Sequence, residues 1–304
     1  MANIQTFVIN LDRAHSRMQA IANQLNALAI PFQRISAIDG HHLTTDQLGC
    51  FDPLAFHKKH GMTVTNGEIG CYLSHLLAIQ AFVNSDADFA LILEDDVIIT
   101  DKLPAALIGV TAHTDQWDMV KLSAIHSGTP YRYLEISTGQ WLCIMLSRCT
   151  GASAYLINRK AAQNYLAQLL PMSLPYDHAF DRGWDLRIKV RLLSPTPCIH
   201  DNQIESTIGF LDPSRKFHWS RRIPTYIYRL KNELQRVFYG LKSIFILLFS
   251  KPKLAVSTPF SDFIRNASSE EKARVYAQVL EKSAGRQNAL LREVEKSDPQ
   301  TKQQ

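Results

Sequence analysis

The sequence predicts an α/β protein in which helices flank a mixed, mostly parallel sheet. Short apolar runs alternate with segments of helical periodicity, turn signals separate the two, and one apolar run ends in three consecutive acids. Strands that alternate with helices favour such a sheet, because each helix returns the chain across one of its faces. Of the 304 residues, 46% are hydrophobic and 20% are charged, which is typical of a globular protein.

The first part of the chain alternates between the two patterns. Met18, Ile21 and Leu25 recur at helical spacing, and Pro31 marks the end of that helix. We expect, in order, a strand over 6–10, a helix over 18–28, a strand over 32–38, an irregular or locally helical excursion over 41–66, a helix over 68–83 and a strand over 89–93.

The middle of the chain continues the alternation with shorter elements. Asn158 is a helix-capping residue type, and Pro171 stops the helix that follows it. We expect a strand over 119–122, a hairpin over 129–146, a strand over 151–157, a helix from 158 to about 170 and a mixed segment over 175–197.

The three consecutive acids follow an apolar run within Phe89-Ala-Leu-Ile-Leu-Glu-Asp-Asp-Val-Ile-Ile-Thr100. In an extended chain Glu94 and Asp96 point to one face and Asp95 to the other. Paired carboxylates at the end of a strand are hard oxygen ligands that suit Mg²⁺ or Mn²⁺, held jointly with a ligand's phosphates. The alternative is a solvated turn in which Asp95 and Asp96 cap the next segment.

The cysteines and the N-terminus favour a cytoplasmic protein. The five cysteines are scattered, without a CxxC pair, and we expect reduced, mostly buried thiols. The N-terminal residues run straight into a strand-like segment and lack the basic and long apolar regions of a secretory signal.

Basic charge is concentrated near the C-terminus. Residues 215–253 contain ten Lys or Arg and one acid, Glu233, so this segment carries +9 and the rest of the chain −4. A nucleic-acid partner for the whole protein is therefore not expected. We divide the chain into a catalytic domain over 1–214 and an extension over 215–304, which ends in a polar tail.

The extension mixes apolar and basic residues over 223–249. Its apolar run 244–249 is far shorter than the roughly 20 residues that span a bilayer. We expect a basic amphipathic helix that lies on an anionic membrane surface, at the inner face of the cytoplasmic membrane. The alternative is a helix that packs on the domain and carries a solvated basic face.

Four segments together carry a resemblance to a known family. They are Phe7-Val-Ile-Asn-Leu-Asp-Arg13 with Arg17, Ile35-Ser-Ala-Ile-Asp-Gly40, Gly67-Glu-Ile-Gly-Cys-Tyr-Leu-Ser-His75 and Leu91-Ile-Leu-Glu-Asp-Asp-Val97. Further matches are Trp117-Asp-Met-Val-Lys-Leu122, Thr150-Gly-Ala-Ser-Ala-Tyr155 and Pro175-Tyr-Asp177. In order and spacing, residues 4–210 resemble glycosyltransferase family 25, the lipooligosaccharide-biosynthesis galactosyltransferases related to collagen galactosyltransferases.

The resemblance implies a GT-A-like nucleotide-diphospho-sugar fold, an activated donor that is most often UDP-galactose, a divalent metal and inversion to a β linkage. The family's metal motif is acid-x-acid at the end of a strand. Asp96 is then the metal ligand, and Glu94 contacts metal-bound water or the donor's sugar and ribose. Glu in the first position leaves open which acid touches the metal. Asp95 is counted with the donor-binding residues, and His200 is a candidate later metal ligand.

Inversion requires a base on the side of the sugar opposite the leaving group, so a further carboxylate is needed. Asp177 matches the family's Pro-x-Asp position and is the predicted base. Asp181 and Asp185 are rivals in the same stretch, and a helical segment would bring all three near one face. Alternatively, Asp177 caps a helix that begins at His178.

The remaining candidates surround the expected donor site. Arg13 and Arg17 follow the first strand, share a helix face and can steer an anionic donor. Asp39 with Gly40 can hold the nucleoside or form an ordinary turn. A helical His is more often structural, and the family match favours a pocket role for His75. The full donor-binding set is Asn10, Arg13, Arg17, Asp39, Ser74, His75, Glu94 and Asp95.

We therefore predict a metal-dependent inverting glycosyltransferase that extends a lipid-linked saccharide of lipooligosaccharide or lipopolysaccharide. The alternatives are a UDP-glucose or N-acetylhexosamine transferase of the same fold, and a catalytically silent membrane adaptor that binds sugar nucleotides. A Rossmann oxidoreductase is not expected, because no GxGxxG motif follows the first strand.

Overall fold

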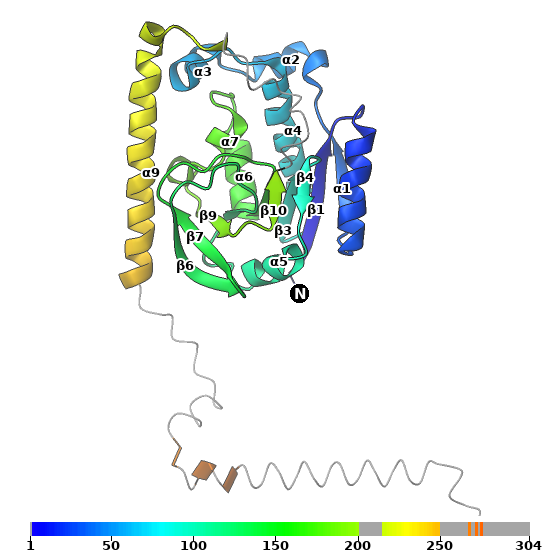
Figure 1. Ribbon diagram of the computed structural model, residues 1–304, viewed down its shortest axis with the longest axis vertical. Helices are drawn as coiled ribbons and strands as arrows, with labels where there is room; N and C mark the ends of the chain where they lie inside the picture. The colour runs from blue at the N-terminus through cyan, green and yellow to red at the C-terminus, as the bar shows by residue number, and fades with distance from the viewer. Residues whose placement is uncertain (1, 201–214, 250–266, 269–270, 273, 276–304) are drawn as a thin grey trace, which may run out of the picture. The chain divides into compact units, whose positions relative to one another are not determined.

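The structure is a computed structural model that describes residues 2–200, 215–249, 267–268, 271–272 and 274–275 (Figure 1). The chain divides into two compact units, Met1–Leu248 and Phe249–Gln304. The elements below lie in the first unit, apart from the last residue of α9. Helix α9 thus belongs to the first unit, although the expected division at residue 214 placed it in a separate extension.

A mixed eight-stranded sheet forms the centre of the first unit, in the order β2-β1-β3-β8-β5-β9-β7-β6. Its strands are β1 Ile4–Asn10, β2 Phe32–Ser36, β3 Phe89–Glu94, β5 Met119–Lys121, β6 Pro130–Ser137, β7 Gln140–Met145, β8 Ala154–Asn158 and β9 Val190–Ser194. A separate two-stranded sheet pairs β4 Val97–Ile99 with β10 Cys198–His200.

The sheet is mixed, as expected, but its parallel part is smaller than expected. Pairing is parallel for β1–β2, β1–β3 and β5–β9, and antiparallel for β3–β8, β5–β8, β7–β9 and β6–β7. Strand β8 enters between β3 and β5 in the opposite direction, and β6–β7 is the expected hairpin. The three parallel strands β2, β1 and β3 therefore form one end of the sheet, where their carboxyl ends share an edge.

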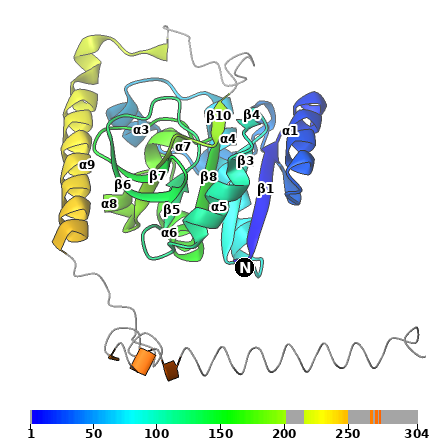
Figure 2. The same ribbon diagram turned by 60° about the horizontal axis from the view of Figure 1, so that its bottom comes forward.

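Helices cover both faces of the sheet (Figures 1 and 2). The longer ones are α1 His15–Ala27, α4 Asn66–Val83, α5 Leu103–Thr111, α6 Arg159–Gln168 and α9 Ile223–Phe249. Short helices are α2 Thr45–Gly49, α3 Pro53–His60, α7 Tyr176–Ala179 and α8 Gly183–Leu186, with 3₁₀ turns η1 Gly40–His42 and η3 Trp219–Arg222.

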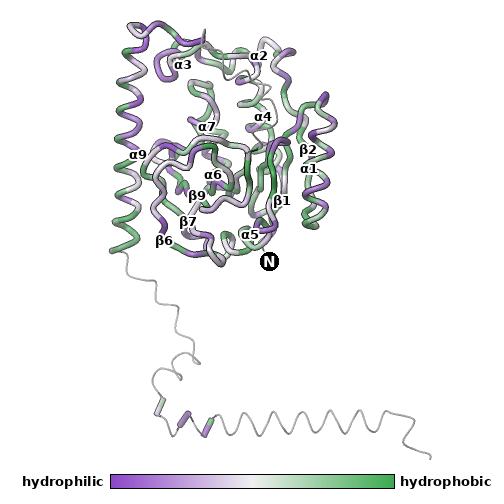
Figure 3. The backbone as a smooth tube through the Cα atoms, in the orientation of Figure 1, coloured by the Kyte–Doolittle hydropathy of each residue, from purple (hydrophilic) through white to green (hydrophobic). Residues whose placement is uncertain are grey.

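Two hydrophobic cores result from the alternation of side chains along the strands. Phe7 and Ile92 join the core under α4 and α6, whereas Val8 and Leu91 join the core under α1 and α5. The strands accordingly contain most of the hydrophobic colour in the centre of Figure 3. Burial on both faces explains why the first and third strands are nearly continuous apolar runs.

Capping residues set the start of two helices. Thr65 Oγ1 accepts from the Glu68 amide at 3.1 Å, and Glu68 Oε2 accepts from the Thr65 amide at 2.7 Å, which is a capping box. Helix α4 therefore begins at Asn66, two residues before the expected start. Asn158 caps α6 as expected, because its Oδ1 accepts from the Ala161 amide at 2.9 Å.

The acidic triplet lies at a turn. Strand β3 ends at Glu94, and Asp95 and Asp96 form the turn into β4. Strand alternation stops there, and all three acids line the same cavity. The expected placement of Asp95 on the opposite face is therefore wrong, because the chain leaves the sheet at this point to pair with β10.

The five cysteines are free thiols, and Cys143, Cys149 and Cys198 are buried. No helix within the described part of the chain is long and apolar enough to cross a membrane.

His60, at the end of α3, is a buried histidine whose pKa is lowered to about 3 by burial and by the nearby His178 and Arg229. The unfolded chain binds a proton near pH 6.5, so this histidine's contribution to stability is complete above pH 6.5 and is lost as pH falls towards 3. The free energy of unfolding should fall between pH 7 and pH 4.5, and we expect this fall to be about 2–3 kcal/mol smaller in His60→Leu than in the unmodified chain. Urea unfolding at both pH values measures this difference.

The exposed His15 provides the matched control. The variant His15→Leu should lose as much stability on acidification as the unmodified chain. Equal pH dependence of His60→Leu and the unmodified chain would contradict the assigned cause.

Candidate active site

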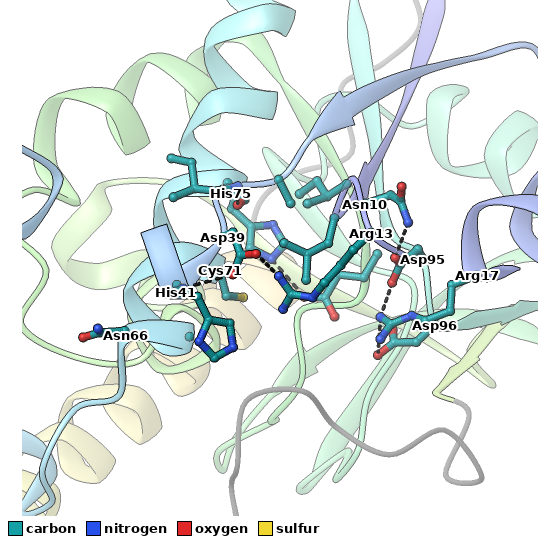
Figure 4. Close-up of a pocket in the computed structure, with 18 of the residues that line it drawn as sticks. Asn10, Arg13, Arg17, Asp39, His41, Asn66, Cys71, His75, Asp95 and Asp96 are labelled. Carbon is teal, nitrogen blue, oxygen red and sulfur yellow. Dashed lines mark hydrogen bonds and ion pairs between the residues drawn. The ribbon is translucent and has the colours of Figure 1, made fainter. Parts of the chain in front are cut away.

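A cavity of about 480 Å³ opens at the carboxyl ends of β1 and β3, beside the N-terminus of α4 (Figure 4). Nine of the predicted site residues line it together: Asn10, Arg13, Arg17, Asp39, Ser74, His75, Glu94, Asp95 and Asp96. They come from four segments that lie far apart in the sequence. Asp177 is not among the lining residues, and the side chain of His200 lies outside the described part of the structure.

Asn10, the last residue of β1, holds Asp95 in place. Its Nδ2 donates to Asp95 Oδ2 at 2.6 Å and to the carbonyl of Ala14 at 3.1 Å, while its Oδ1 accepts from Arg34 Nε at 2.9 Å. Asn10 is 2% exposed. The hydrogen bonds with Ala14 and Arg34 fix the side-chain amide, and the third one orients Asp95.

Two arginines enter the cavity from the segment after β1 (Figure 4). Arg13 forms an ion pair with Asp39 on the opposite wall, and Arg17 forms one with Asp95 and lies 3.7 Å from Asp96. Helix α1 begins at His15, so the expectation that both arginines share a helix face is wrong for Arg13, which lies in the preceding turn. Both guanidinium groups nevertheless reach the same cavity.

The wall that contains Asp39 is fixed to α4. Asp39 caps η1 by accepting from the His41 amide at 3.0 Å, so it forms a turn and lines the cavity at once. Ser74 Oγ accepts from the Ile38 amide at 2.8 Å and donates to the Gly70 carbonyl at 2.6 Å. A Cβ on Gly70 would lie 2.5 Å from the Ile38 carbonyl oxygen, so only glycine permits this approach.

His75 positions Glu94 through a buried hydrogen-bond chain. Its Nε2 lies 3.0 Å from Glu94 Oε1 and its Nδ1 lies 3.0 Å from the Tyr155 hydroxyl, which lies 2.9 Å from that of Tyr176. A carboxylate only accepts, so Nε2 donates to Glu94, Nδ1 accepts from Tyr155, and Tyr155 accepts from Tyr176. The Tyr176 ring also stacks on His75, with centroids 4.0 Å apart and planes 2° from parallel.

The three carboxylates of the acid turn lie close together, and Arg17 is near two of them, Asp95 and Asp96. Burial and the neighbouring Glu94 raise the pKa of Asp96 to about 7, although Arg17 opposes this shift. Burial also raises the pKa of Asp95, against the hydrogen bonds from Asn10 and Arg17. Four carboxylates line this cavity, three of them at the acid turn, and this concentration of negative charge favours a bound cation.

Two sets of side chains could hold that cation. Within the described residues, Cys71, His75 and Glu94 have ligand atoms within 4.8 Å of one another. Burial first, and then the carboxylates of Glu94, Asp177 and Asp96, raise the pKa of the Cys71 thiol well above its usual value, whereas a metal needs the thiolate. Both ring nitrogens of His75 are already hydrogen-bonded. The oxygens of the acid turn fit a hard divalent ion better.

Asp177 lies in the first turn of the short helix α7, whose N-cap is Pro175. The alternative in which Asp177 caps a helix starting at His178 is therefore wrong. Its Oδ2 accepts from the Gly151 amide at 3.3 Å. The negative charge of Asp177 helps to raise the pKa of the Cys71 thiol, as the charges of Glu94 and Asp96 do. Asp177 and the acid turn therefore act on the same thiol.

The two rivals of Asp177 have other partners. Asp181 is buried, and both of its carboxylate oxygens accept from Arg236 of α9, at 3.0 and 3.1 Å. Asp185 is exposed and pairs with Arg182. This geometry favours structural roles for both.

His200 ends β10 opposite Val97, the residue that follows Asp96. Its backbone is therefore next to the acid turn.

Part of the cavity wall was not predicted as site residues, namely Thr65, Asn66 and Gly67 at the N-terminus of α4. The backbone N–H groups at a helix N-terminus bind anions such as phosphate. The signal was present as Thr-x-x-Glu over residues 65–68, the capping box that starts this helix.

The mixed, helix-flanked sheet, with an acid-lined cavity at the ends of its parallel strands, is the arrangement expected for a GT-A-like fold. The chain belongs to glycosyltransferase family 25 (LPS biosynthesis protein), whose sequence pattern matches residues 3–180. The resemblance found in the sequence motifs is thus confirmed.

Individual relatives point in the same direction. The lipooligosaccharide biosynthesis protein lic2B of Haemophilus influenzae is 25% identical over 182 residues, which cover 58% of this chain and 67% of that protein. Procollagen galactosyltransferase 2 of Homo sapiens is 28% identical over 124 residues, which cover 38% of this chain and 20% of that protein. The chain thus spans only about a fifth of this animal relative.

A solved glycosyltransferase, involved in the glycosylation of the major capsid of PBCV-1, aligns with 78% of this chain and 99% of its own at a TM-score of 0.37 and 9% identity. The family assignment rests on the sequence match and takes nothing from this likeness.

Proposed function

We propose that the protein is an inverting hexosyltransferase that moves galactose from UDP-galactose to a saccharide acceptor of lipooligosaccharide or lipopolysaccharide. The observation that carries the proposal is that the three carboxylates of the acid turn, two arginines and a helix N-terminus line the same cavity. Acids that can hold a divalent metal, next to arginines and helix amides that can bind phosphate, suit a metal–diphosphate complex. The names of the relatives, a lipooligosaccharide biosynthesis protein and a procollagen galactosyltransferase, supply the sugar and the acceptor class.

The donor's diphosphate would lie between the acid turn and the cationic groups. Arg13 and Arg17 reach the cavity, and the first amides of α4 line it. Asp39 would give up its ion pair with Arg13 to contact the nucleoside. Asn10 and Ser74, whose polar atoms already have protein partners, would shape the donor site without leaving those partners.

Asp96, with Glu94 and His200, would hold Mn²⁺ or Mg²⁺. When bound, the metal neutralises the charge that develops on the departing diphosphate. Arg17 already pairs with this turn, so it would share the acids with the metal and lie beside the leaving group.

Asp177 would act as the base. The acceptor hydroxyl oxygen forms a bond to the anomeric carbon, the bond from that carbon to the diphosphate oxygen breaks with its electron pair leaving on UDP, and the hydroxyl proton passes to the Asp177 carboxylate. One displacement inverts the anomeric carbon and gives a β linkage. The hydrogen bond from Gly151 keeps the carboxylate oriented.

A donor panel tests this proposal. UDP release from UDP-galactose, UDP-glucose and UDP-N-acetylglucosamine is measured with Mn²⁺, Mg²⁺ or chelator, using purified lipooligosaccharide cores as acceptors. We expect metal-dependent release that is fastest with UDP-galactose, and a β linkage in the product by NMR. Faster turnover with another donor would select the UDP-glucose or N-acetylhexosamine alternative. Donor binding without turnover of any donor would instead support the silent adaptor.

The base assignment has its own matched variants. Asp177→Asn should lower kcat by about 10²–10⁴-fold and leave donor affinity unchanged, because only proton transfer is affected. Asp185→Asn should retain kcat, since its carboxylate pairs with Arg182 at an exposed position. The reverse pattern would move the base to Asp185.

His75 should affect the rate through Glu94. His75→Phe keeps the stacking on Tyr176 but removes both hydrogen bonds, so we expect kcat to fall about 10–100-fold, as for other groups that orient metal ligands. His75→Gln should restore part of the rate, because its amide can donate to Glu94. Steady-state kinetics with melting curves measure both effects. Equal kcat for His75→Phe and His75→Gln, at equal stability of the two variants, would contradict the positioning role.

The acceptor is proposed to be lipid-linked, so that the protein works at the inner face of the cytoplasmic membrane through its basic segment 215–253. The charge of that segment supports this placement.

A further inference from the structure

Helix α9 packs on the first unit through polar and small residues. Its buried residues are Thr225, Arg236 and Gly240, which are spaced by about three turns and one turn and therefore share a face. A Cβ on Gly240 would lie 2.7 Å from Leu146 Cδ2, so the helix backbone approaches the body closely. The Tyr239 hydroxyl donates to the Ile188 carbonyl at 2.8 Å and accepts from the Val190 amide at 3.0 Å.

The apolar residues of α9 lie on the other side. Six of them, which we name the outward stripe, are Ile227, Leu230, Leu234, Phe238, Leu241 and Leu248, and they are between 51% and 70% exposed. Their spacings of three, four or seven residues place them on one face. Figures 1 and 3 show the helix along the side of the unit, with apolar residues most frequent towards its C-terminal end. A helix on a globular domain normally turns such a stripe inward, so this one is built for an external apolar environment.

The charges around the outward stripe identify that environment. Residues 215–249 contain eight Lys or Arg and one acid, Glu233, which lies 4.0 Å from Arg236 of the same helix. Two of the eight, Arg215 and Arg236, are buried in ion pairs with Glu68 and Asp181, whereas Lys216, Arg221, Lys231 and Lys242 are exposed. Exposed basic residues beside the stripe (the basic flanks), such as Lys231 and Lys242, would repel those of a second copy, because the one acid of this helix, Glu233, already lies beside Arg236. Anionic lipid headgroups instead complement these flanks, and no described helix can span a bilayer.

We propose that α9 lies parallel to an anionic membrane surface, with the outward stripe at the boundary between headgroups and acyl chains and the basic flanks at the lipid phosphates. The helix is about 40 Å long, so contact extends along one whole side of the unit. The proposal rests on the proposed function and identifies the surface by which the protein would bind the membrane that contains its acceptor. Vesicle binding needs no catalysis, so the two proposals can fail separately.

Flotation of the full chain with vesicles tests the surface. We compare phosphatidylcholine vesicles with vesicles containing about 30% phosphatidylglycerol, at low and high salt. The test variant is Leu230→Ser/Phe238→Ser/Leu241→Ser. The control is Leu54→Ser/Ile108→Ser, which removes apolar residues that are 71% and 73% exposed on α3 and α5. We expect tight, salt-sensitive binding to anionic vesicles, a loss of at least tenfold in the test variant and no loss in the control.

Two further measurements test the basic residues beside the stripe and the oligomeric state of the protein. Lys231→Gln/Lys242→Gln should weaken binding to anionic vesicles and reduce its salt dependence. UDP release with a water-soluble acceptor should be unchanged in the stripe variant. Full vesicle binding by the stripe variant would overturn the proposal. A second result would also overturn it. If the unmodified chain does not bind vesicles but forms a dimer in sedimentation, and the stripe variant is monomeric, then the stripe contacts a second copy of the chain and not a membrane.

Discussion

Replacing Asp96 by asparagine is expected to lower kcat for sugar transfer by about 10²–10³-fold, the range seen when a group that stabilises transition-state charge is lost. Asparagine keeps the size of the side chain but removes the charge that would hold the metal beside the leaving diphosphate. Burial and the neighbouring Glu94 raise the pKa of Asp96 to about 7, and a bound cation beside this carboxylate would lower that pKa. Its loss should therefore weaken metal binding as well as turnover.

Isothermal titration with Mn²⁺ and steady-state kinetics at saturating donor measure the two effects. Asp101→Asn, at an exposed position five residues on and outside the cavity lining, is the matched control and should change neither. Unchanged metal affinity and kcat in Asp96→Asn would remove the acid turn from the proposed mechanism.

The second large effect concerns stability. Arg236→Met should lower the free energy of unfolding by about 3–5 kcal/mol, because it leaves the Asp181 carboxylate buried without its cation. The side chains are 3% and 0% exposed, and two hydrogen bonds of 3.0 and 3.1 Å join them. The pair connects α9 to the segment between α7 and α8, so its loss should also loosen the helix from the unit.

Urea unfolding of Arg236→Met is compared with Asp181→Leu/Arg236→Met, which removes both charges. The double variant should recover most of the loss, since no charge is then left buried without its partner. Asp185→Asn, which breaks the more exposed ion pair with Arg182, should cost less than about 1 kcal/mol. Equal losses for the exposed and the buried pair would contradict this explanation.

Much of the fold could be predicted because local patterns report local structure. The alternation of apolar runs with helical spacing located the strands and helices, and Asn158 marked the start of a helix by its side chain alone. The direction of β8 could not be predicted in this way, since strand pairing depends on how distant segments meet. The same limit applies to Asp95, whose side follows from the turn after β3 and not from the run before it.

All eight predicted donor-site residues line one cavity, because the segments that contain them meet at the same edge of the sheet. Motif position could not show what each side chain contacts there. His75 lies beside the donor cavity as expected, but its nitrogens are directed to Glu94 and Tyr155. The sequence also could not predict which face of α9 is exposed to solvent, because an amphipathic pattern does not indicate which side packs on the protein.

The stacking of Tyr176 on His75 has a mechanical consequence. Tyr176 precedes Asp177, the proposed base, and His75 holds Glu94, a proposed metal ligand, so the stacked rings connect these two residues. A shift of α7 would therefore also move the His75 ring and Glu94 at the end of β3. If Asp177 and Glu94 have the proposed roles, this contact would hold the base at a fixed distance from the metal-bound diphosphate while the acceptor hydroxyl displaces it.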